Sequence, residues 1–189
     1  MSDVEAAEST AIVLDYLPHG RTAGDRPQYE QAPLAHALGV QDFRLYEIVL
    51  EEDHEIAIGD EVGVRPAGPE VAEFRELTYD DLSSGASAEL EYVVREMLER
   101  FEDRFVTVFN DAQPITLRLH QLNLLPGIGD KLRDDIIDER RRGAFESFAD
   151  LEERIDGLHD PEGAIVGRIL EELEDADIKY YLFVRGGPY

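Results

Sequence analysis

The 189-residue sequence predicts an α+β protein, in which a small β-barrel with one long helix precedes an all-α domain. Two observations support this prediction. Before residue 80, short runs rich in aromatic and β-branched residues are separated by turn residues, a spacing typical of small barrels. After residue 84, the apolar residues recur mostly at helical spacing.

The chain is strongly acidic, with 43 Asp and Glu residues against 18 Lys and Arg and a formal net charge of −25. Leu, Ile, Val and Phe make up 54 of the 189 residues, roughly 29%, which is above the roughly 20% below which highly charged chains fail to build a core. Nucleic-acid-binding proteins are usually basic, so any positive surface on this chain must be local. The bases are 16 Arg and only 2 Lys, Lys131 and Lys179. This bias is typical of salt-accumulating halophiles such as haloarchaea, and the alternative is an ordinary acidic protein that prefers Arg.

Several classes of protein are excluded by what the sequence lacks. The absence of Cys excludes a disulfide framework and thiolate chemistry. No apolar run approaches the roughly 18 residues that a membrane-spanning helix needs. The acidic N-terminal residues do not resemble a signal peptide. We therefore expect a cytoplasmic protein without membrane partners, whose residues 1–10 form a disordered tail.

Four segments have the composition of strands and are expected to form a barrel over residues 11–112. The strands are expected at residues 12–17, 43–50, 59–65 and 71–77. Pro18-His19-Gly20 ends the first strand, and Gly and Pro breakers indicate an irregular loop over residues 20–33. Glu51-Glu-Asp-His-Glu55 has the composition of a charged turn after the second strand.

One long amphipathic helix is expected after the fourth strand. Its apolar residues are spaced for one helical face: Leu90, Val93, Val94, Met97, Leu98 and Phe101. Ser84 or Ser87 can cap its start. Phe105–Phe109 has the composition of a short strand that would close the barrel. An all-α domain is then expected over residues 113–176, with a C-terminal strand and tail at 177–189.

The most informative motif is a Gly-rich hairpin between two expected helices. The first helix is expected at 116–124, and Leu125-Pro-Gly-Ile-Gly-Asp-Lys131 follows it. The next helix ends at Arg140–Arg142 and Gly143, which form a typical C-terminal signal. This order is the pattern of the helix-hairpin-helix, a motif that grips nucleic acid without reading its sequence.

The residue types of the hairpin suit a phosphate group. Gly127 and Gly129 permit a tight turn and keep side chains away from it. The backbone N–H groups of the hairpin and of the next helical turn then face outward, where they can donate to a phosphate oxygen. Lys131 adds a positive charge at the same place. Nothing in the motif can read a base edge, so the contact would position the protein without specifying sequence.

A second helix-hairpin-helix is expected to follow the first. Ser147–Asp150 has the spacing of a helix cap, and Asp160-Pro161 is typical of a helix start. The hairpin region between them, residues 157–163, has its glycines displaced relative to the first. We expect a pseudo-twofold, four-helix unit in which the first hairpin binds and the second mainly braces it. Residues 178–184 are expected to form a final strand that adds to the barrel.

The candidate nucleic-acid-binding residues are the hairpin and its flanking bases: Pro126, Gly127, Ile128, Gly129, Asp130, Lys131, Arg133 and Arg118. Secondary candidates are arginines of an expected loop and of a helix end: Arg21, Arg26, Arg140, Arg141 and Arg142. Residues 116–142 carry six bases and five acids, so the rest of the chain holds all of the negative excess. The alternative is a dimerisation or docking module, in which Arg140–Arg142 only satisfy the end of their own helix.

Taken together, these segments resemble an archaeal domain-of-unknown-function family, DUF655, over nearly the full chain. The matching stretches are Val13–Pro18, Asp25–Pro27, Gly59–Val62, Leu77–Leu82, Arg104–Val106, Phe109–Asn110, Ile115–Leu122, Leu124–Gly129, Arg140, Phe145–Phe148 and Asp160–Pro161. The resemblance implies an OB-like N-terminal barrel joined to a helix-hairpin-helix domain, and the family's gene neighbourhoods favour RNA as the target. Relatives are expected to carry Lys at position 130, so Asp130 would make this hairpin less basic.

An OB-like barrel implies a second binding surface, where bases stack on exposed aromatic residues and cations follow the backbone. Candidates by residue type are Tyr16, Phe43, Tyr46 and Phe74, with Arg44, Arg65 and Arg75 nearby. Packing in the core is the alternative role of each aromatic residue.

The sequence contains no recognisable catalytic or metal-binding motif, because its five histidines are scattered and no nucleophile elbow or phosphate loop is present. By analogy with other helix-hairpin-helix units, the hairpin carbonyls could hold a monovalent cation, and no other cofactor is expected. We predict a non-catalytic protein that binds the phosphate backbone of RNA, or of DNA, in ribosome biogenesis or RNA metabolism. The alternative is an interaction adaptor of the transcription or ribosome-assembly machinery.

Overall fold

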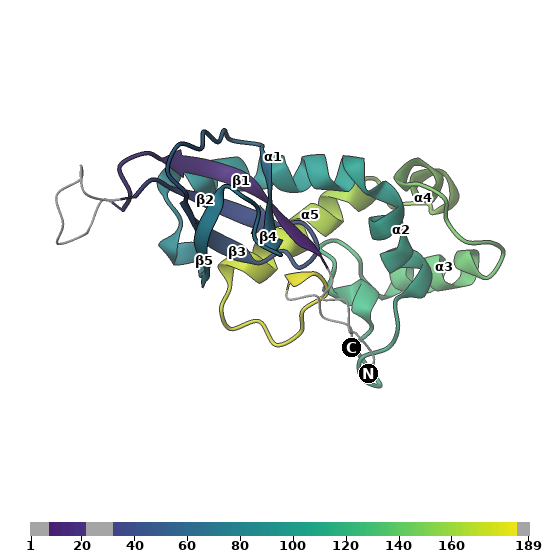
Figure 1. The fold of residues 1–189 in the computed structure, drawn as a ribbon. Helices are drawn as coiled ribbons and strands as arrows, with labels where there is room; N and C mark the ends of the chain where they lie inside the picture. The colour runs from purple at the N-terminus through teal and green to yellow at the C-terminus, as the bar shows by residue number, and fades with distance from the viewer. Residues whose placement is uncertain (1–7, 22–31, 185–189) are drawn as a thin grey trace, which may run out of the picture. The chain divides into compact units, whose positions relative to one another are not determined.

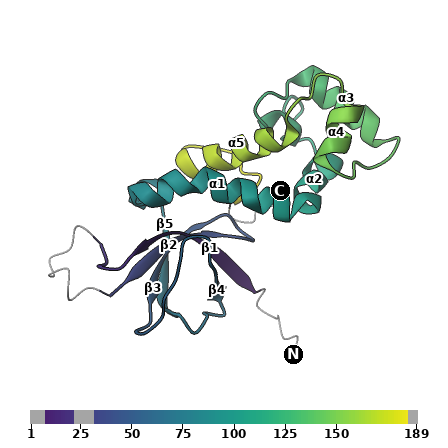
Figure 2. The same cartoon turned by 90° about the horizontal axis from the view of Figure 1, so that it is seen from above.

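A curled, five-stranded antiparallel sheet forms the N-terminal part of the protein (Figures 1 and 2). The computed structural model describes residues 8–21 and 32–184. The strands are β1 (Ser9–Leu17), β2 (Leu34–Gly39), β3 (Leu45–Leu50), β4 (Glu61–Arg65) and β5 (Val71–Leu77). They lie in the order β4-β1-β2-β3-β5, so β4 and β5 are the edge strands. Four of the five were predicted, with shifts of a few residues at their ends.

Small side chains line one face of this sheet. Ala11, Ala35 and Ala37 are fully buried there, and larger residues such as Ile48 and Val62 fill the remaining space. Alternation of small and large side chains suits the inner face of a strongly curved sheet, where space is limited. The expected disordered tail overlaps β1 at Ser9 and Thr10, and its residues 1–7 lie outside the described residues.

The strand that the sequence did not indicate is β2, Leu34–Gly39. Its sequence, Leu-Ala-His-Ala-Leu-Gly, has weak intrinsic strand preference. It nevertheless lies centrally in the sheet, pairs with β1 and β3 on its two sides, and is buried along its whole length. Tertiary pairing therefore overrides the local preference in this segment.

Within the described residues, five α-helices follow the sheet. They are α1 (Ser84–Arg100), α2 (Glu102–Asp111), α3 (Asp130–Arg140), α4 (Phe148–Arg154) and α5 (Pro161–Glu174). The predicted long helix is thus confirmed as α1. The predicted strand at Phe105–Phe109 is wrong, because this segment lies within α2. Phe105, Val106 and Phe109 are buried on one side of that helix, and helical spacing decides the outcome over the β-branched composition.

Two further predictions are wrong in the C-terminal half. Residues 116–124 do not form an α-helix: Pro114 and His120 form an isolated β-bridge, and a short 3-10 helix, η3 (Gln121–Leu124), follows. Residues 178–184 form irregular backbone with bends in place of a strand. Their apolar composition is explained by packing, since Phe183 is buried and its ring lies edge-on to Phe43, with centroids 6.4 Å apart.

The described chain divides into two compact units within α1. Residues 8–93 and 183–184 form the sheet unit, and residues 94–182 form the helical unit. This division differs from the expected domain boundary at 112–113, because α2 belongs with the helices that follow it. Within the described residues, no helix combines the length and the apolar character that crossing a membrane requires.

Candidate nucleic-acid interface

The first hairpin is a tight turn with an apolar inner side. The N–H of Ile128 donates to the carbonyl of Leu125 at 3.2 Å. Pro126 and Gly127 occupy the middle of this turn, and Gly127 has a φ of +82°, which glycine adopts without strain. Leu125 and Ile128 are buried and anchor the turn in the helical unit. Within the described structure, a Cβ atom added at Gly127 or Gly129 would meet nothing within 4 Å, so the outer side is open.

Helix α3 begins directly at this open side. Gly129 is its N-cap, and the first helical hydrogen bond runs from the N–H of Arg133 to the carbonyl of Gly129 at 3.0 Å. Glycine has no side chain to cap the helix, and no side chain of the described residues caps α3. The first N–H groups of a helix have no partner within the helix, and they carry the positive end of its dipole. Asp130, Lys131 and Leu132 contribute such groups at this hairpin.

Asn123 braces the hairpin from behind. Its side-chain amide donates to the carbonyl of Ile128 at 3.3 Å, and its Oδ1 accepts from Nη1 of Arg133 at 3.2 Å. The hairpin lines an open hollow of about 560 Å³. Its lining comprises residues 123–129 together with Arg168 and Glu171 of α5. The hairpin therefore forms one wall of a concave surface with a fixed backbone.

The same turn recurs before α5. There the N–H of Leu158 donates to the carbonyl of Ile155 at 3.2 Å, and Gly157 has a φ of +88°. Ile155 and Leu158 are buried, as Leu125 and Ile128 are in the first turn. The expectation of displaced glycines is therefore wrong for the turn itself. Gly157 occupies the place of Gly127, and only the second glycine is replaced, by His159.

The two turns differ at the helix that each introduces. Asp160 is the N-cap of α5, and its carboxylate accepts a hydrogen bond from the N–H of Gly163 at 2.8 Å. Pro161 occupies the first turn of α5, as predicted, where its missing N–H is harmless. The N-terminus of α5 is therefore capped by a carboxylate, whereas α3, which has Asp130 in its first turn, has no side-chain cap.

The basic residues beside the first hairpin form ion pairs with neighbouring acids. The Nζ of Lys131 lies 2.7 Å from Asp135, and Arg133 lies 2.9 Å from both Asp130 and Asp134. Hydrogen bonding to Asp135 raises the pKa of Lys131. The Lys131 side chain is 82% exposed, and pairs as exposed as this contribute little to stability. The Lys131–Asp135 pair can therefore break with little cost to the fold.

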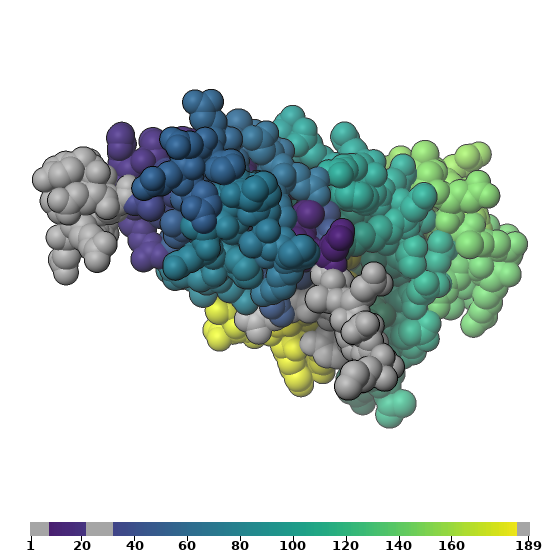
Figure 3. Space-filling view, in the orientation of Figure 1, coloured from purple at the N-terminus to yellow at the C-terminus, as the bar shows by residue number. Residues whose placement is uncertain are grey.

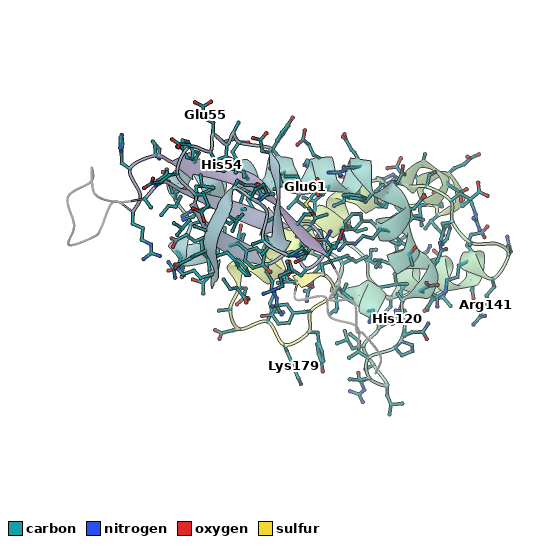
Figure 4. All side chains as sticks on the ribbon, viewed as in Figure 1. His54, Glu55, Glu61, His120, Arg141 and Lys179 are labelled. Atoms are coloured by element: carbon teal, nitrogen blue, oxygen red, sulfur yellow. The ribbon has the colours of Figure 1, made fainter. Side chains whose placement is uncertain are left out.

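Arg118 lies in the loop between α2 and η3, which protrudes at the lower edge of Figure 3. The Oγ1 of Thr116 fixes this loop by accepting from the N–H groups of Arg118 and Leu119, at 3.2 and 3.0 Å. The guanidinium of Arg118 is exposed and has no ion pair among the described residues. Leu117 beside it is fully exposed. The loop leads through His120, labelled in Figure 4, into η3 and the hairpin.

Among the secondary candidates, Arg140 has a structural role. Its Nη1 donates to the carbonyls of Phe109 and Ala112, at 3.1 and 3.0 Å, and so satisfies the C-terminal end of α2. Burial lowers its pKa. Arg141 and Arg142 are exposed and pair with Asp138 and Glu139 of their own helix, and Arg141 points into solvent in Figure 4.

Sequence reasoning missed Arg154, which ties α3 to α4. Its Nη2 donates to the carbonyls of Glu139 and Gly143, at 3.0 and 2.7 Å, and its guanidinium lies 4.4 Å from the ring centroid of Phe145. A single Arg in an acidic helix gives no local signal of such a role.

The aromatic residues proposed as a stacking surface belong mostly to the core. Phe43 and Tyr46 are buried, and Phe74 packs edge-on against Tyr46 with centroids 6.0 Å apart. Burial and a hydrogen bond to Asp42 raise the pKa of Tyr46 to about 12. Tyr16 is half-buried against the same core.

The remaining basic candidates of the sheet unit are Arg21 and Arg26. Arg21 pairs with the buried carboxylate of Glu47, whose second partner is Arg75. Arg26 lies outside the described residues. The signal for this cluster was Glu47 itself, a charged residue in the middle of an otherwise apolar strand.

No metal site is evident in the described part of the chain, which has no group of three or more His, Asp or Glu side chains able to hold an ion. His54 and Glu55 are exposed and follow a turn at residues 52–53, and Glu55 lies at the upper edge of Figure 4. A monovalent cation at the hairpin stays a prediction, and two hairpin carbonyls, those of Leu125 and Ile128, already accept hydrogen bonds.

The comparisons with known proteins point to one family. The family model described as "Protein of unknown function (DUF655)" matches residues 7–185. The chain is similar to an uncharacterized protein of Methanocaldococcus jannaschii, MJ0038, with 41% identity over 181 residues, which cover 94% of this chain and 80% of that protein. It is also similar to the crystal structure of Af1531 from Archaeoglobus fulgidus, with a TM-score of 0.83 and 38% identity. That match covers 93% of this chain and 99% of the other.

Proposed function

The chain belongs to the DUF655 family of proteins of unknown function, and we propose that it is a non-catalytic nucleic-acid-binding protein. In this proposal the first hairpin and the N-terminus of α3 hold a phosphate group of the backbone. RNA is the proposed target, in ribosome biogenesis or RNA metabolism. The contact has no sequence preference, because backbone N–H groups meet the phosphate and no side chain of the hairpin reads a base.

The observation that carries the proposal is the difference between the two hairpins. Both turns have a glycine at the same position with a positive φ, and both introduce a helix. The N-cap of the helix after the second turn is Asp160, whose carboxylate caps it, and the N-cap of the helix after the first turn is Gly129, one residue nearer its turn and without a side chain. An uncapped helix N-terminus behind an open glycine turn suits an external anion.

We also propose a finer assignment of the fold. The repeated turn between helices supports a tandem helix-hairpin-helix unit, in which the second hairpin braces the first. The curled sheet with five antiparallel strands supports an OB-like barrel. Such a barrel could add a second nucleic-acid surface to that of the hairpin.

The high acidity supports a protein adapted to a salt-rich, halophilic cytoplasm. At molar salt the Debye length is only about 3 Å, so long-range attraction between a basic patch and RNA is largely screened. Affinity that rests on counterion release also falls steeply with salt. Short hydrogen bonds from the backbone of residues 129–132 lose less under these conditions. Binding experiments therefore belong in molar KCl.

Three substitutions at Gly129 test the proposal. Gly129→Ala should leave the dissociation constant for RNA within about twofold of the wild-type value, because a methyl group neither caps the helix nor carries a charge. The position also has space for it. Gly129→Asp introduces the cap that α5 already has, and should weaken binding at least about tenfold through competition at the N-terminus of α3. Gly129→Asn, a neutral cap, should lie between them. Anisotropy of a labelled ribosomal RNA fragment in 1–2 M KCl gives the dissociation constants.

Thermal unfolding provides the control for this series. Asp and Asn are favoured N-cap residues, so neither substitution should lower the melting temperature. If all three variants bind RNA equally well, the hairpin is not the binding site. If wild type itself has no affinity for ribosomal or transfer RNA or for DNA, the proposed function is wrong.

The second candidate function is a protein-interaction adaptor, and the exposed loop favours it. Leu117 is fully exposed on a loop that Thr116 holds through hydrogen bonds. An exposed aliphatic side chain of this kind can insert into a pocket of a partner protein. An adaptor should show no RNA affinity in the series above. It should instead recover a specific protein partner in a salt-matched pull-down that Leu117→Asp abolishes.

A further inference from the structure

A row of ionisable side chains crosses four neighbouring strands on one face of the sheet. Asp15 of β1 is the register partner of His36 of β2, which is the partner of Glu47 of β3. Glu47 in turn is the partner of Arg75 of β5. Glu47 and His36 are buried, with 2% and 5% of their surface exposed. Directly opposed residues share a face, so the row is contiguous.

Glu47 is the centre of this row and holds two arginines at once. The Nε of Arg75 donates to Oε1 at 2.9 Å, and its Nη2 donates to Oε2 at 3.3 Å. The Nε of Arg21 donates to Oε2 at 3.0 Å, and its Nη2 donates to Oε1. Because both guanidinium groups bond the same two oxygens, they lie side by side.

Both arginines keep unused donors that face solvent. Each guanidinium has five N–H donors, and Glu47 takes two from each. The side chains of Arg21 and Arg75 are 53% and 52% exposed. Within residues 8–21 and 32–184, the Nη1 atom of neither residue has a hydrogen-bond partner. The pair thus presents two sets of fixed donors on the surface of the sheet.

The other groups near the pair are occupied or neutral. The Nδ1 of His36 accepts a hydrogen bond from the N–H of Ser83 at 3.1 Å, and burial lowers the pKa of this imidazole. Asp81 lies near both arginines, and its carboxylate accepts from the N–H and Oγ1 of Thr78, at 3.1 and 2.9 Å. The charges of the two arginines are balanced by Glu47 and Asp81. Directed donors, and not net charge, are therefore what the pair can offer a ligand.

A buried carboxylate is a costly way to stabilise a fold. Burial of an ion pair loses hydration, and apolar replacements are often equally stable or more stable. Glu47 orients two flexible side chains, Arg21 and Arg75, and an apolar residue could not do this. Fixed guanidinium groups suit bidentate recognition of phosphate, because their planar donors match its oxygens.

We propose that Arg21 and Arg75, held by Glu47, form a phosphate-binding site on the sheet, in addition to the hairpin. The site takes a phosphate group through the remaining N–H donors of both guanidinium groups. The proposal rests on the proposed function for the source of this phosphate, the backbone of RNA. A free phosphorylated compound would offer the same chemistry and is distinguished below.

The first test compares Arg75 with an arginine outside the sheet. Arg75→Gln removes the guanidinium group with its charge and its N–H donors. Arg75→Lys keeps the positive charge but loses the planar arrangement of donors that the guanidinium provides. Both should raise the dissociation constant for a labelled single-stranded RNA at least about threefold, and the Gln variant should lower the salt slope by about 0.7 for the lost phosphate contact. Arg100→Gln is the control, since Arg100 is an exposed arginine of α1 outside the row and outside the candidate binding residues, and it should bind as wild type does.

Glu47→Gln separates orientation from charge. It removes one negative charge, so general attraction between protein and RNA would become stronger. If Glu47 orients the arginines, binding instead weakens at least about threefold, because an amide N–H₂ turned toward a guanidinium repels it and releases the pair. Thermal unfolding checks that this variant is folded, and Arg75→Lys decides the question if it is not. Wild-type or tighter binding by both variants overturns the proposal.

Two further arms distinguish the outcomes. Loss of RNA binding in Gly129→Asp, with no effect of the Arg75 variants, contradicts the sheet site and leaves the hairpin proposal standing. Loss only in the Arg75 and Glu47 variants supports the sheet site and contradicts the hairpin. Inorganic tripolyphosphate is the second probe. If it binds wild type but not Arg75→Gln, and RNA binding is equal in both, the site takes a free phosphorylated compound.

Discussion

At the scale of single residues, Glu47 is the most consequential charged side chain of the sheet. Burial opposes its ionisation, but hydrogen bonds and charges from Arg21 and Arg75 outweigh burial and lower its pKa from 4.5 to about 2. A carboxyl group whose pKa is lowered by folding stabilises the folded state wherever it is ionised in both states. Its contribution is therefore complete above about pH 4.5 and is lost as the pH falls toward 2.

We predict that Glu47→Gln removes this pH-dependent part of the stability. Above pH 5 the variant should be less stable than wild type by an amount on the order of 2 kcal/mol. The difference should shrink steadily as the pH falls from 4.5 toward 2. Denaturant unfolding of both proteins at a series of pH values gives the difference, in which the titration of the other acids cancels. A difference that stays constant across this range would contradict the assigned pKa.

Residues also mark the limit of inference from sequence. The glycines of the first hairpin and the cap at Asp160 could be predicted because each has a local backbone reason. The roles of Arg140 and Arg154 could not, since both donate to carbonyl groups that are distant in sequence. Nothing in a run of three arginines shows which of them is half-buried.

At the scale of elements, the two hairpins invite a direct comparison. Asp160 stabilises the start of α5 through its hydrogen bond to Gly163. The cap leaves no space for a side chain at Gly163, where a Cβ atom would lie 2.1 Å from the carboxylate. The element is therefore built for stability, whereas α3 lacks the same device.

We predict that Asp160→Ala lowers the free energy of unfolding by about 1 kcal/mol, the usual value of an N-cap. RNA binding by this variant should remain within about twofold of wild type, because α5 does not hold the phosphate in the proposed function. Asp160→Ser, which keeps a cap, is the matched control and should retain most of the stability. Loss of RNA affinity in a folded Asp160→Ala variant would mean that the second hairpin binds as well.

Elements differ in how well their sequences predict them. Helix α1 has a long apolar stripe and was predictable, and the strands β1, β3, β4 and β5 have β-branched or aromatic residues. β2 was missed because its position between two strands, and not its composition, makes it a strand. Residues 105–109 were wrongly predicted as a strand, because five residues are too few to separate helical from strand spacing in an apolar run.

At the scale of the whole molecule, the net charge of −25 dominates. Repulsion among so many carboxylates destabilises the compact state at low ionic strength, and salt screens it.

We predict that the melting temperature rises by at least about 10 °C between 0.1 and 2 M KCl, because screening of this repulsion is nearly complete at molar salt. Differential scanning fluorimetry measures the shift. An equal concentration series of sorbitol is the control, and a melting temperature that responds to KCl no more than to sorbitol would argue against adaptation to salt.

The proposed function rests most directly on the backbone N–H groups at the start of α3. Amide chemical shifts in ¹H–¹⁵N spectra, recorded while a short RNA is added in molar KCl, report on these groups one by one. The proposed contact predicts the largest downfield shifts at Asp130, Lys131 and Leu132, and small shifts at Glu162 and Gly163 in the capped start of α5. Equal small shifts at both helix starts, while RNA is bound elsewhere, would contradict it.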